Sequence, residues 1–360
     1  MKTSNYYAIC LGIAILCLLT SVGISITSSL ADAGPYMIAF FVFLGIGFTG
    51  YSKLKGFAYS VMIFAAVTTA LYYPGYLVEL NGFKLAGLII PLIQLIMFGM
   101  GTSMSVGDFV AVVKTPKAVV IGVFAQFLIM PVIGFTLANI SGFAPEIAAG
   151  IILIGCSPSG LASNVMNYLA KANLALSITI TSVTTLLAPF VTPLLMKLLA
   201  GAFIEIDIVK MMWDIMKMVI IPIGAGLIFN KIFSGKSAWL DAAMPYVSMF
   251  GIGLIIAIIT AAGRDSLLDI GIILIGLVTI HNLAGYTIGY WFGRMFKMNE
   301  RDCRTIAIEV GMQNGGLASG IAKEMGKIGT VGLAPAVFGP LMNITGSILA
   351  SYWHRKPPKD

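Results

Sequence analysis

Long apolar runs follow one another along the 360 residues of this chain, separated by short polar, glycine or proline segments. About 20 apolar residues at a rise of 1.5 Å cross the hydrocarbon core of a bilayer, so each run can form one transmembrane helix. The twelve runs lie near 7–28, 36–52, 57–74, 83–103, 117–138, 146–171, 173–199, 208–231, 242–262, 267–293, 302–325 and 329–353. This pattern predicts an all-α polytopic membrane protein with almost no extramembrane domain.

The composition excludes whole classes of protein. The chain is 58% hydrophobic and 10% charged, with a mean hydropathy of +0.96, whereas about a quarter of the residues of a soluble domain are charged. Soluble enzymes, nucleic-acid-binding proteins and receptors with large ectodomains are therefore excluded. The bilayer is the expected partner, and the four cysteines show neither disulfide nor metal-binding spacing.

The basic residues indicate the orientation of the chain. With twelve spans both termini lie on one side, and Lys and Arg accumulate in cytoplasmic loops. Fifteen of the 22 basic residues fall on the side of the termini, six fall on the other side, and Lys217 lies within a run. We therefore expect a multi-pass protein of the inner (plasma) membrane with both termini in the cytoplasm. The net charge of +7 is assigned to topology rather than to an anionic partner.

Two of the spans are interrupted. The sixth contains Gly155-Cys-Ser-Pro-Ser-Gly160, and the eleventh contains Gly311-Met-Gln-Asn-Gly-Gly316. Proline removes a backbone donor and glycine weakens a helix, so each cluster is expected to break its span near mid-membrane. Free backbone groups at that depth are tolerated only where they line a cavity or are buried in protein. Such breaks indicate a binding site.

The two breaks are related by an offset of 156 residues. Gly155 to Ser163 matches Gly311 to Ser319 at five of nine positions, and Lys171 and Gln126 fall opposite Lys327 and Asn282. Five spans separate the breaks, an odd number, so the two copies would run in opposite directions. Inverted repeats with discontinuous helices are typical of secondary transporters.

Glu309 is the carboxylate that stands furthest from any predicted loop, directly before the second break. An ionised carboxylate in a bilayer costs at least a few kcal/mol unless it is paired. Glu309 is therefore expected to hold a cation or a proton, although a protonated Glu that only ties helices together remains an alternative. Asp214 is interpreted as an interfacial residue with Lys210 and Lys217 on its own helical face.

Oxygen-bearing side chains near the breaks fit a hard monovalent cation. Ser177 and Thr181 are four residues apart and share one helix face. Ser163 and Asn164 follow the first break. Gln126 and Gln313 are amides in apolar surroundings, where helix–helix hydrogen bonding is the alternative role.

Three blocks of sequence resemble the bile acid:sodium symporter family, in particular its bacterial members. The blocks are Ser163-Asn-Val-Met-Asn-Tyr-Leu-Ala170, Ala175-Leu-Ser-Ile-Thr-Ile-Thr-Ser-Val-Thr-Thr-Leu-Leu-Ala-Pro189 and Ile308-Glu-Val-Gly-Met-Gln-Asn314. The resemblance implies an inverted-repeat, ten-helix transporter unit over 57–353 with two crossing discontinuous helices. Its panel would cover 57–103 and 208–262, and its core 117–199 and 267–353. Residues 1–56 would add two further N-terminal helices, and 354–360 a cytoplasmic tail.

The resemblance also implies two sodium sites and a substrate site. The first sodium site would use Ser163, Asn164, Ser177, Thr181 and Glu309. The second would use Gln126, Glu309, Gln313 and the backbone carbonyls of Val310 and Met312. The organic anion would lie beside Ser159, Gly160, Leu161, Asn314, Gly315, Gly316 and Asn343. There the half-helix N-termini would direct free amides at a carboxylate.

The implied function is sodium-coupled import of an organic anion, a bile acid or a smaller carboxylate such as pantoate, by a monomer that is not an enzyme. Relatives often carry a Gly-Gly-Thr or similar sequence at the first break, where this chain has Ser159-Gly160-Leu161, and some carry His where Met342 stands. These departures leave the substrate open. A proton-coupled or other anion carrier is one alternative. An intramembrane hydrolase with Ser157 or Ser159 as nucleophile and His281 as base is a distant one.

Overall fold

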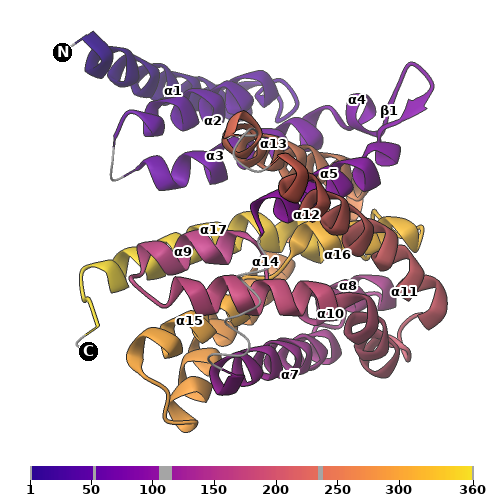
Figure 1. Ribbon diagram of the computed structural model, residues 1–360. Coiled ribbons are helices and arrows are strands. Elements are labelled where there is room, and N and C mark those ends of the chain that lie inside the picture. Colours follow the sequence, from indigo (N-terminus) through magenta and orange to yellow (C-terminus); the bar gives the residue numbers. More distant parts are fainter. Residues whose placement is uncertain (1, 52–53, 105–115, 234–237, 359–360) are drawn as a thin grey trace.

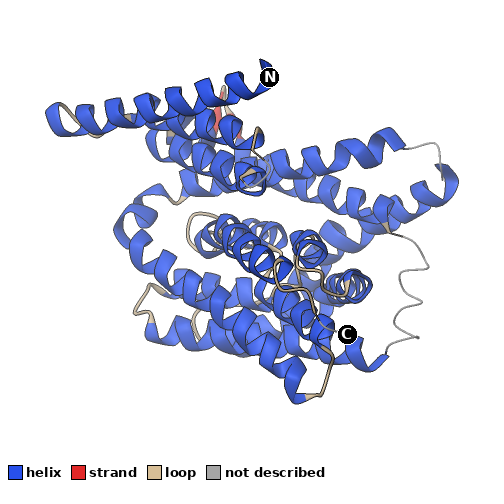
Figure 2. Ribbon diagram, turned by 90° about the vertical axis from the view of Figure 1, so that its left-hand side faces the viewer, coloured by secondary structure: helices blue, strands red, loops and turns tan. Residues whose placement is uncertain are grey.

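The computed structural model of the chain describes residues 2–51, 54–104, 116–233 and 238–358. Nine helices within these ranges are long and apolar enough to cross a membrane. Figure 2 shows that helices make up almost the whole molecule and that strand is confined to one small hairpin. The expectation of a polytopic, helical membrane protein is confirmed.

The helices follow the predicted spans closely. Those of the first half are α1 (Lys2–Thr27), α2 (Gly34–Thr49), α3 (Lys55–Tyr72), the short α4 (Pro74–Val78), α5 (Ile89–Ser103), α7 (Pro116–Ile140), α8 (Pro145–Cys156) and α9 (Ala162–Leu169). Those of the second half are α10 (Leu174–Ala200), α11 (Ile208–Ile215), α12 (Ile221–Phe233), α13 (Ala238–Ala262), α14 (Arg264–Met295), α15 (Glu300–Gly311), α16 (Gly315–Glu324) and α17 (Leu333–His354).

Side chains at the helix ends explain several of these boundaries. Asn173 accepts a hydrogen bond from the backbone N–H of Leu176 and starts α10, and Asn299 accepts one from Asp302 and starts α15. Such caps satisfy amides that have no partner inside the helix. Pro145 occupies the first turn of α8, where its missing N–H costs nothing.

The fourth span is shorter than predicted. The sequence places its start at residue 83, but Phe83–Lys84 forms strand β2, which pairs with β1 (Glu79–Leu80), and α5 begins only at Ile89 after a short 3₁₀ turn, η1 (Leu85–Leu88). Asn81 and Gly82 turn the hairpin with positive φ angles of 50° and 83°. Asn-Gly is the preferred pair for such a turn, because both positions adopt left-handed backbone conformations.

The eighth span is continuous but irregular. Between α11 and α12, residues Met216–Ile220 form a π-helical segment, η2. Segments of this kind are wider than an α-helix and are found mostly near functional sites.

Both predicted interruptions are confirmed, and the two breaks lie against each other. Residues 157–161 separate α8 from α9, and 312–314 separate α15 from α16. The N–H of Gly160 donates to the carbonyl of Met312 (2.8 Å), and the N–H of Asn314 donates to the carbonyl of Pro158 (2.8 Å). Gly160 is required here, because a Cβ at that position would lie 2.6 Å from the carbonyl oxygen of Gln313. Each break therefore provides hydrogen-bond partners for backbone groups of the other.

The helices pack in two groups around these breaks. α7, α8, α9, α10, α14, α15 and α17 pack closely on one another, while α5 packs with α12 and α13. α1 packs on α2, and α2 packs on α3. In Figure 1 these three helices lie at the top, far from α7, α10 and α15 at the bottom. The first break therefore joins two helices of the group that contains α15, and the second joins α15 to α16, which packs on helices of both groups.

Candidate sodium site

The carboxylate of Glu309 lies near the end of α15, directly before the second break. Five side chains donate hydrogen bonds to it. Those to Oε1 come from Ser163 (2.6 Å), Ser177 (2.6 Å) and Asn167 (3.1 Å), and those to Oε2 come from Ser159 (2.6 Å) and Thr181 (2.8 Å). The donors belong to the first break, to α9 and to α10, so three separate segments converge on one side chain.

This group, which we call the Glu309 cage, is buried and uncharged apart from Glu309. All six residues are at most 1% exposed. Among the described residues no lysine or arginine forms an ion pair with Glu309. An ionised carboxylate accepts hydrogen bonds and donates none, which suits five donors. Burying it costs several kcal/mol even with hydrogen bonds, and a cation bound beside it would offset that cost.

Asn164 lies in a second layer around Glu309. Its Oδ1 lies 2.7 Å from the hydroxyl oxygen of Ser177 and 3.4 Å from that of Thr181. The structure therefore brings together all five side chains expected at the first sodium site. Asn164 is the member that does not touch the carboxylate.

A second polar group lies beside the second break. The side-chain amide of Gln126, on α7, donates to Oε1 of Gln313 (2.8 Å) and to the carbonyl of Ser157 (3.0 Å). Gln313 donates in turn to the carbonyl of Val310 (2.6 Å). Three of the groups expected at the second sodium site are thus in contact, whereas the Met312 carbonyl accepts from Gly160.

Each group contains a buried oxygen atom that has no hydrogen-bond partner. These atoms are Oδ1 of Asn167 and Oε1 of Gln126. Buried acceptors are nearly always satisfied, so an unpaired one calls for an explanation. Sodium prefers hard oxygen ligands, and carboxylate, hydroxyl and amide oxygens are the atoms gathered here. The donor sets of both groups therefore fit a small monovalent cation.

Comparison with known proteins decides the family. Residues 90–270 match the Sodium Bile acid symporter family. The chain belongs to this family. The resemblance inferred from the three sequence blocks is thereby confirmed.

Relatives in bacteria and plants support the assignment. The chain is 41% identical over 266 residues to a Bacillus subtilis protein named "Uncharacterized sodium-dependent transporter YocS", covering 74% of this chain and 82% of that protein. It is 30% identical over 263 residues to the Arabidopsis thaliana "Probable sodium/metabolite cotransporter BASS1, chloroplastic", covering 73% of this chain and 66% of the relative. These relatives are named as transporters, and the chain is a membrane transporter rather than an enzyme.

Sequence reasoning missed two members of the Glu309 cage. Asn167 was not selected, although it lies four residues after Ser163, on the same helical face. Ser159 was expected beside the substrate, but its hydroxyl lies 2.6 Å from Glu309 Oε2. The sequence spacing carried a signal for Asn167. It carried none for Ser159, whose position depends on how the two breaks cross.

The other residues predicted to bind substrate lie in the breaks or at the start of the helices that follow them, apart from Asn343 on α17. Leu161, Gly316 and Asn343 are half-buried, while Gly160, Asn314 and Gly315 are buried. Free amides were expected at the half-helix N-termini, Ser159 to Leu161 and Gly315 to Leu317, and this expectation is wrong for three of these residues. Gly160 donates to Met312, Gly315 to the Gln313 carbonyl (3.0 Å), and Leu317 to Oδ1 of Asn314 (3.0 Å). These three backbone amides are hydrogen-bonded within the protein, so they are not free to bind a carboxylate.

The hydrolase alternative finds no support in the geometry. Nε2 of His281 lies 3.0 Å from the carbonyl of Met130, and its ring packs edge-on against Phe338. The hydroxyl of Ser157 donates to Leu153 (2.9 Å), within its own helix. Neither Ser157 nor Ser159 is hydrogen-bonded to His281, as a Ser-His pair requires. His281 is a hydrogen-bonded core residue.

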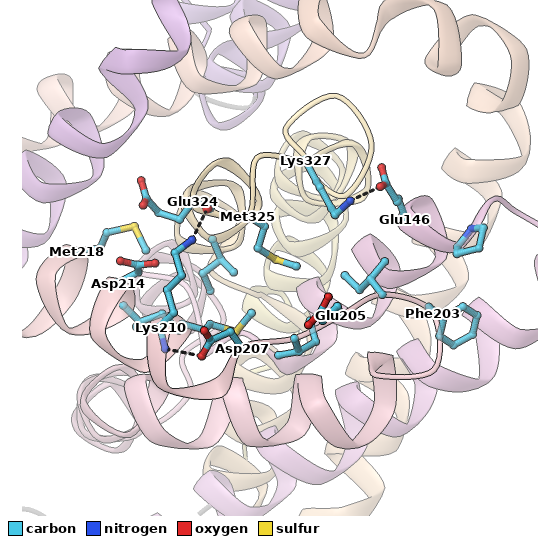
Figure 3. A pocket seen from close by; sticks show the side chains of 16 residues that line it. Glu146, Phe203, Glu205, Asp207, Lys210, Asp214, Met218, Glu324, Met325 and Lys327 are labelled. Carbon is cyan, nitrogen blue, oxygen red and sulfur yellow. Dashed lines mark hydrogen bonds and ion pairs between the residues drawn. The ribbon is translucent and has the colours of Figure 1, made fainter.

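A cavity of about 630 Å³ lies on another part of the transporter, between α11, α16 and the α10–α11 loop. We call it the α11–α16 cavity. Figure 3 shows its charged side chains, which are Glu146, Glu205, Asp207, Asp214, Glu324, Lys210 and Lys327. Its lining contains none of the seven residues predicted to bind substrate.

Of the two lysines expected on the helical face of Asp214, one forms an ion pair with it. Asp214 pairs with Lys217 (3.0 Å). The ammonium of Lys210 instead reaches across the α11–α16 cavity to the carbonyl of Glu324 (3.2 Å), as Figure 3 shows. Lys327 pairs with Glu146 in the same cavity. Glu146 and Asp214 therefore have basic partners, whereas Glu309 has none among the described residues.

Proposed function

We propose that this chain is a sodium-coupled symporter that imports a small organic anion by alternating access. The observation that carries the proposal is the Glu309 cage, in which one buried carboxylate faces only neutral donors. A small cation is the partner that such a site lacks, and oxygen atoms are what sodium prefers. The printed names of the relatives, sodium-dependent transporter and sodium/metabolite cotransporter, support the same function.

Charge balance supports coupling between sodium and an anion. Two sodium ions, one in the cage and one beside Gln126 and Gln313, would leave a net charge of +1 next to Glu309. In a medium of low dielectric constant such an excess attracts an anion strongly. A carboxylate bound near the crossing would neutralise it, so each ligand favours binding of the other.

The proposed architecture is that of an inverted repeat. The core would comprise 117–199 and 267–353 and the panel 57–103 and 208–262, with both termini in the cytoplasm of a monomer in the inner membrane. Gln126, which donates to Ser157 at the first break, and Asn282, which donates to Gly311 at the second (2.8 Å), support the repeat. The extra helices α1 and α2 would extend the panel, because they reach the rest of the chain through α3.

Proton coupling is the second candidate, because a protonated Glu309 would also remove the buried charge. Replacement of sodium by choline at fixed pH separates the two mechanisms. Sodium coupling predicts that uptake of the transported anion stops in choline, and unaffected uptake would favour protons. The anion itself is found by measuring thermal stability with carboxylates from pantoate to bile salts, because a substrate stabilises the folded state by mass action.

Membrane potential provides an independent test. Two sodium ions entering with one monoanion carry one net positive charge, which is worth about 2.3 kcal/mol per 100 mV. Accumulation of substrate in proteoliposomes should therefore rise when a potassium–valinomycin gradient makes the interior negative. Electroneutral uptake would contradict a stoichiometry of two sodium ions per monoanion.

A further inference from the structure

Several hydrogen bonds outside the Glu309 cage join the turn between α9 and α10 to α15. The N–H of Asn173 donates to the hydroxyl of Thr305 (2.9 Å), which lies 3.2 Å from the Asn173 carbonyl. The side-chain amide of Asn173 donates to Asp302 (2.7 Å). One residue of the turn thus meets α15 at three points, and Thr305 is fully buried.

Arg304, on α15, forms hydrogen bonds to the end of α9. Its guanidinium donates to the carbonyl of Ala170 (3.4 Å), to that of Lys356 (2.8 Å) and to Glu300 (2.8 Å). The residue is only 5% exposed, although the sequence places it among loop charges. A buried guanidinium is retained where its donors find fixed acceptors. Here those acceptors belong to α9, to the C-terminal segment and to α15 itself.

The register of these contacts relates them to the Glu309 cage. Ser177 follows Asn173 by four residues on α10, and Glu309 follows Thr305 by four residues on α15. Residues four apart lie one above the other on a helix face. The hydrogen bond from Ser177 to Glu309 (2.6 Å) therefore lies one turn beyond that between Asn173 and Thr305. Asn167 likewise precedes Ala170 by about one turn.

We propose that Asn173, Asp302, Arg304 and Thr305 form a clamp that sets the sodium affinity of the Glu309 cage by fixing α9 and α10 at hydrogen-bonding distance from α15. The inference rests on the proposed function, because it takes the cage as a sodium site. Oxygen ligands must be held within about 0.5 Å of the geometry that an ion requires. No side chain of the clamp bonds to a side chain of the cage, and the link between them is the backbone hydrogen bond from the N–H of Ser177 to the carbonyl of Asn173 (3.0 Å). The clamp residues therefore act as positioning residues.

Thr305→Val tests the clamp, because it removes the hydroxyl and keeps the volume. Sodium binding is measured on the purified protein as the rise in the thermal midpoint with sodium, at constant ionic strength with choline. Loss of the shared hydrogen bonds should raise the half-saturating sodium concentration about fivefold to tenfold. Uptake should show the same shift and should recover at saturating sodium, since the cage residues are intact.

Two matched variants separate positioning from general damage. Thr305→Ser retains the hydroxyl and should stay within about twofold of the wild-type half-saturation. Thr68→Val removes a buried hydroxyl on α3 that bonds only within its own helix, to Phe64 (2.7 Å), and should also leave sodium binding unchanged. If Thr305→Val does not fold, Asp302→Ala removes one arm of the clamp and should give a shift of about twofold to fivefold.

The outcomes distinguish this inference from the function on which it rests. A wild-type protein whose midpoint does not respond to sodium would overturn both. A wild type that responds, combined with an unchanged half-saturation in Thr305→Val and Asp302→Ala, would overturn the clamp alone. So would an equal shift in Thr68→Val or a failure of Thr305→Ser to restore the affinity.

Discussion

The Glu309 cage and the α11–α16 cavity both contain carboxylates, but the surroundings of these carboxylates differ in charge and in exposure to solvent. In the cage one carboxylate is surrounded by five neutral donors, and every residue is at most 1% exposed. In the cavity of about 630 Å³ several carboxylates share the space with Lys210 and Lys327, and Glu146 is partly open to solvent. Charge is compensated in the cavity by lysine and solvent, and in the cage by neither.

This difference supports Glu309, rather than a carboxylate of the cavity, as the proposed sodium ligand. Water and a lysine satisfy a carboxylate at a cavity surface, where an ion pair contributes about 0–1 kcal/mol. A buried carboxylate that lacks its partner is costly by several kcal/mol. In the proposed mechanism a cation supplies the positive charge that the cage residues do not, whereas Lys327 already pairs with Glu146 in the cavity.

The largest effect is expected from Glu309→Ala. Without the carboxylate, two sodium ions and an anion cannot be held together, so uptake should fall at least a hundredfold, in line with about 3–5 kcal/mol for breaking a buried charge pair. Asp214→Asn in the α11–α16 cavity should change uptake less than about threefold. Normal sodium-dependent uptake by Glu309→Ala would rule out the ion assignment. Equal losses of uptake in the two variants would show that the cage and the cavity do not differ in their role in transport.

A smaller effect is expected when one hydroxyl of the cage is removed. Thr181→Val deletes a 2.8 Å hydrogen bond to Glu309 and a potential sodium ligand. The half-saturating sodium concentration for uptake should rise about tenfold, with the maximal rate recovered at high sodium. The control is Thr184→Val on the same helix, because the Thr184 hydroxyl bonds only to α10 carbonyls, Ile180 (2.8 Å) and Thr181 (3.1 Å). An equal shift in both would mean that α10 packing, not ligation, is responsible.

Gln126→Leu tests whether the second group is a separate site. Loss of its unpaired oxygen should leave one sodium bound, so the Hill coefficient for sodium should fall from about two to about one. Gln94→Leu serves as the control, because Gln94 donates only to the backbone of Lys217 (3.3 Å). A Hill coefficient near two in Gln126→Leu would place the second ion elsewhere.

The smallest effect is expected in the α11–α16 cavity. Lys327→Met breaks the pair with Glu146, whose side chain is 37% exposed. Solvent screens such a pair, so the thermal midpoint should fall by no more than about 2 °C and sodium half-saturation should not change. A large loss of sodium affinity would show that the cavity and the cage are coupled.

Much of this picture was predictable from sequence, because membrane burial leaves few polar residues to consider. The isolation of Glu309, the spacing of Ser177 and Thr181 and both helix breaks were visible in the chain and are found in the structure. The hairpin turn at Asn81 and Gly82 was not predicted, because it lies in a polar gap where hydropathy gives no boundary.

The sequence did not predict how the two helix breaks cross. The amides of Gly160 and Asn314 are paired because two breaks 156 residues apart meet, which no local pattern encodes. Arg304 lies in a charged stretch of the sequence, yet it is buried against carbonyls of Ala170, just after α9, and of Lys356 in the C-terminal segment. Only three-dimensional contacts separate such a buried arginine from a solvated one.

Equilibrium binding of radioactive sodium to the purified protein, without substrate, tests the central claim most directly. The account predicts saturable binding of about two sodium ions per chain, and loss of that binding in Glu309→Gln, which keeps the shape of the side chain and removes its charge. Glu79→Gln, in the exposed β1 strand, should bind as the wild type does. Undiminished sodium binding in Glu309→Gln would contradict the account.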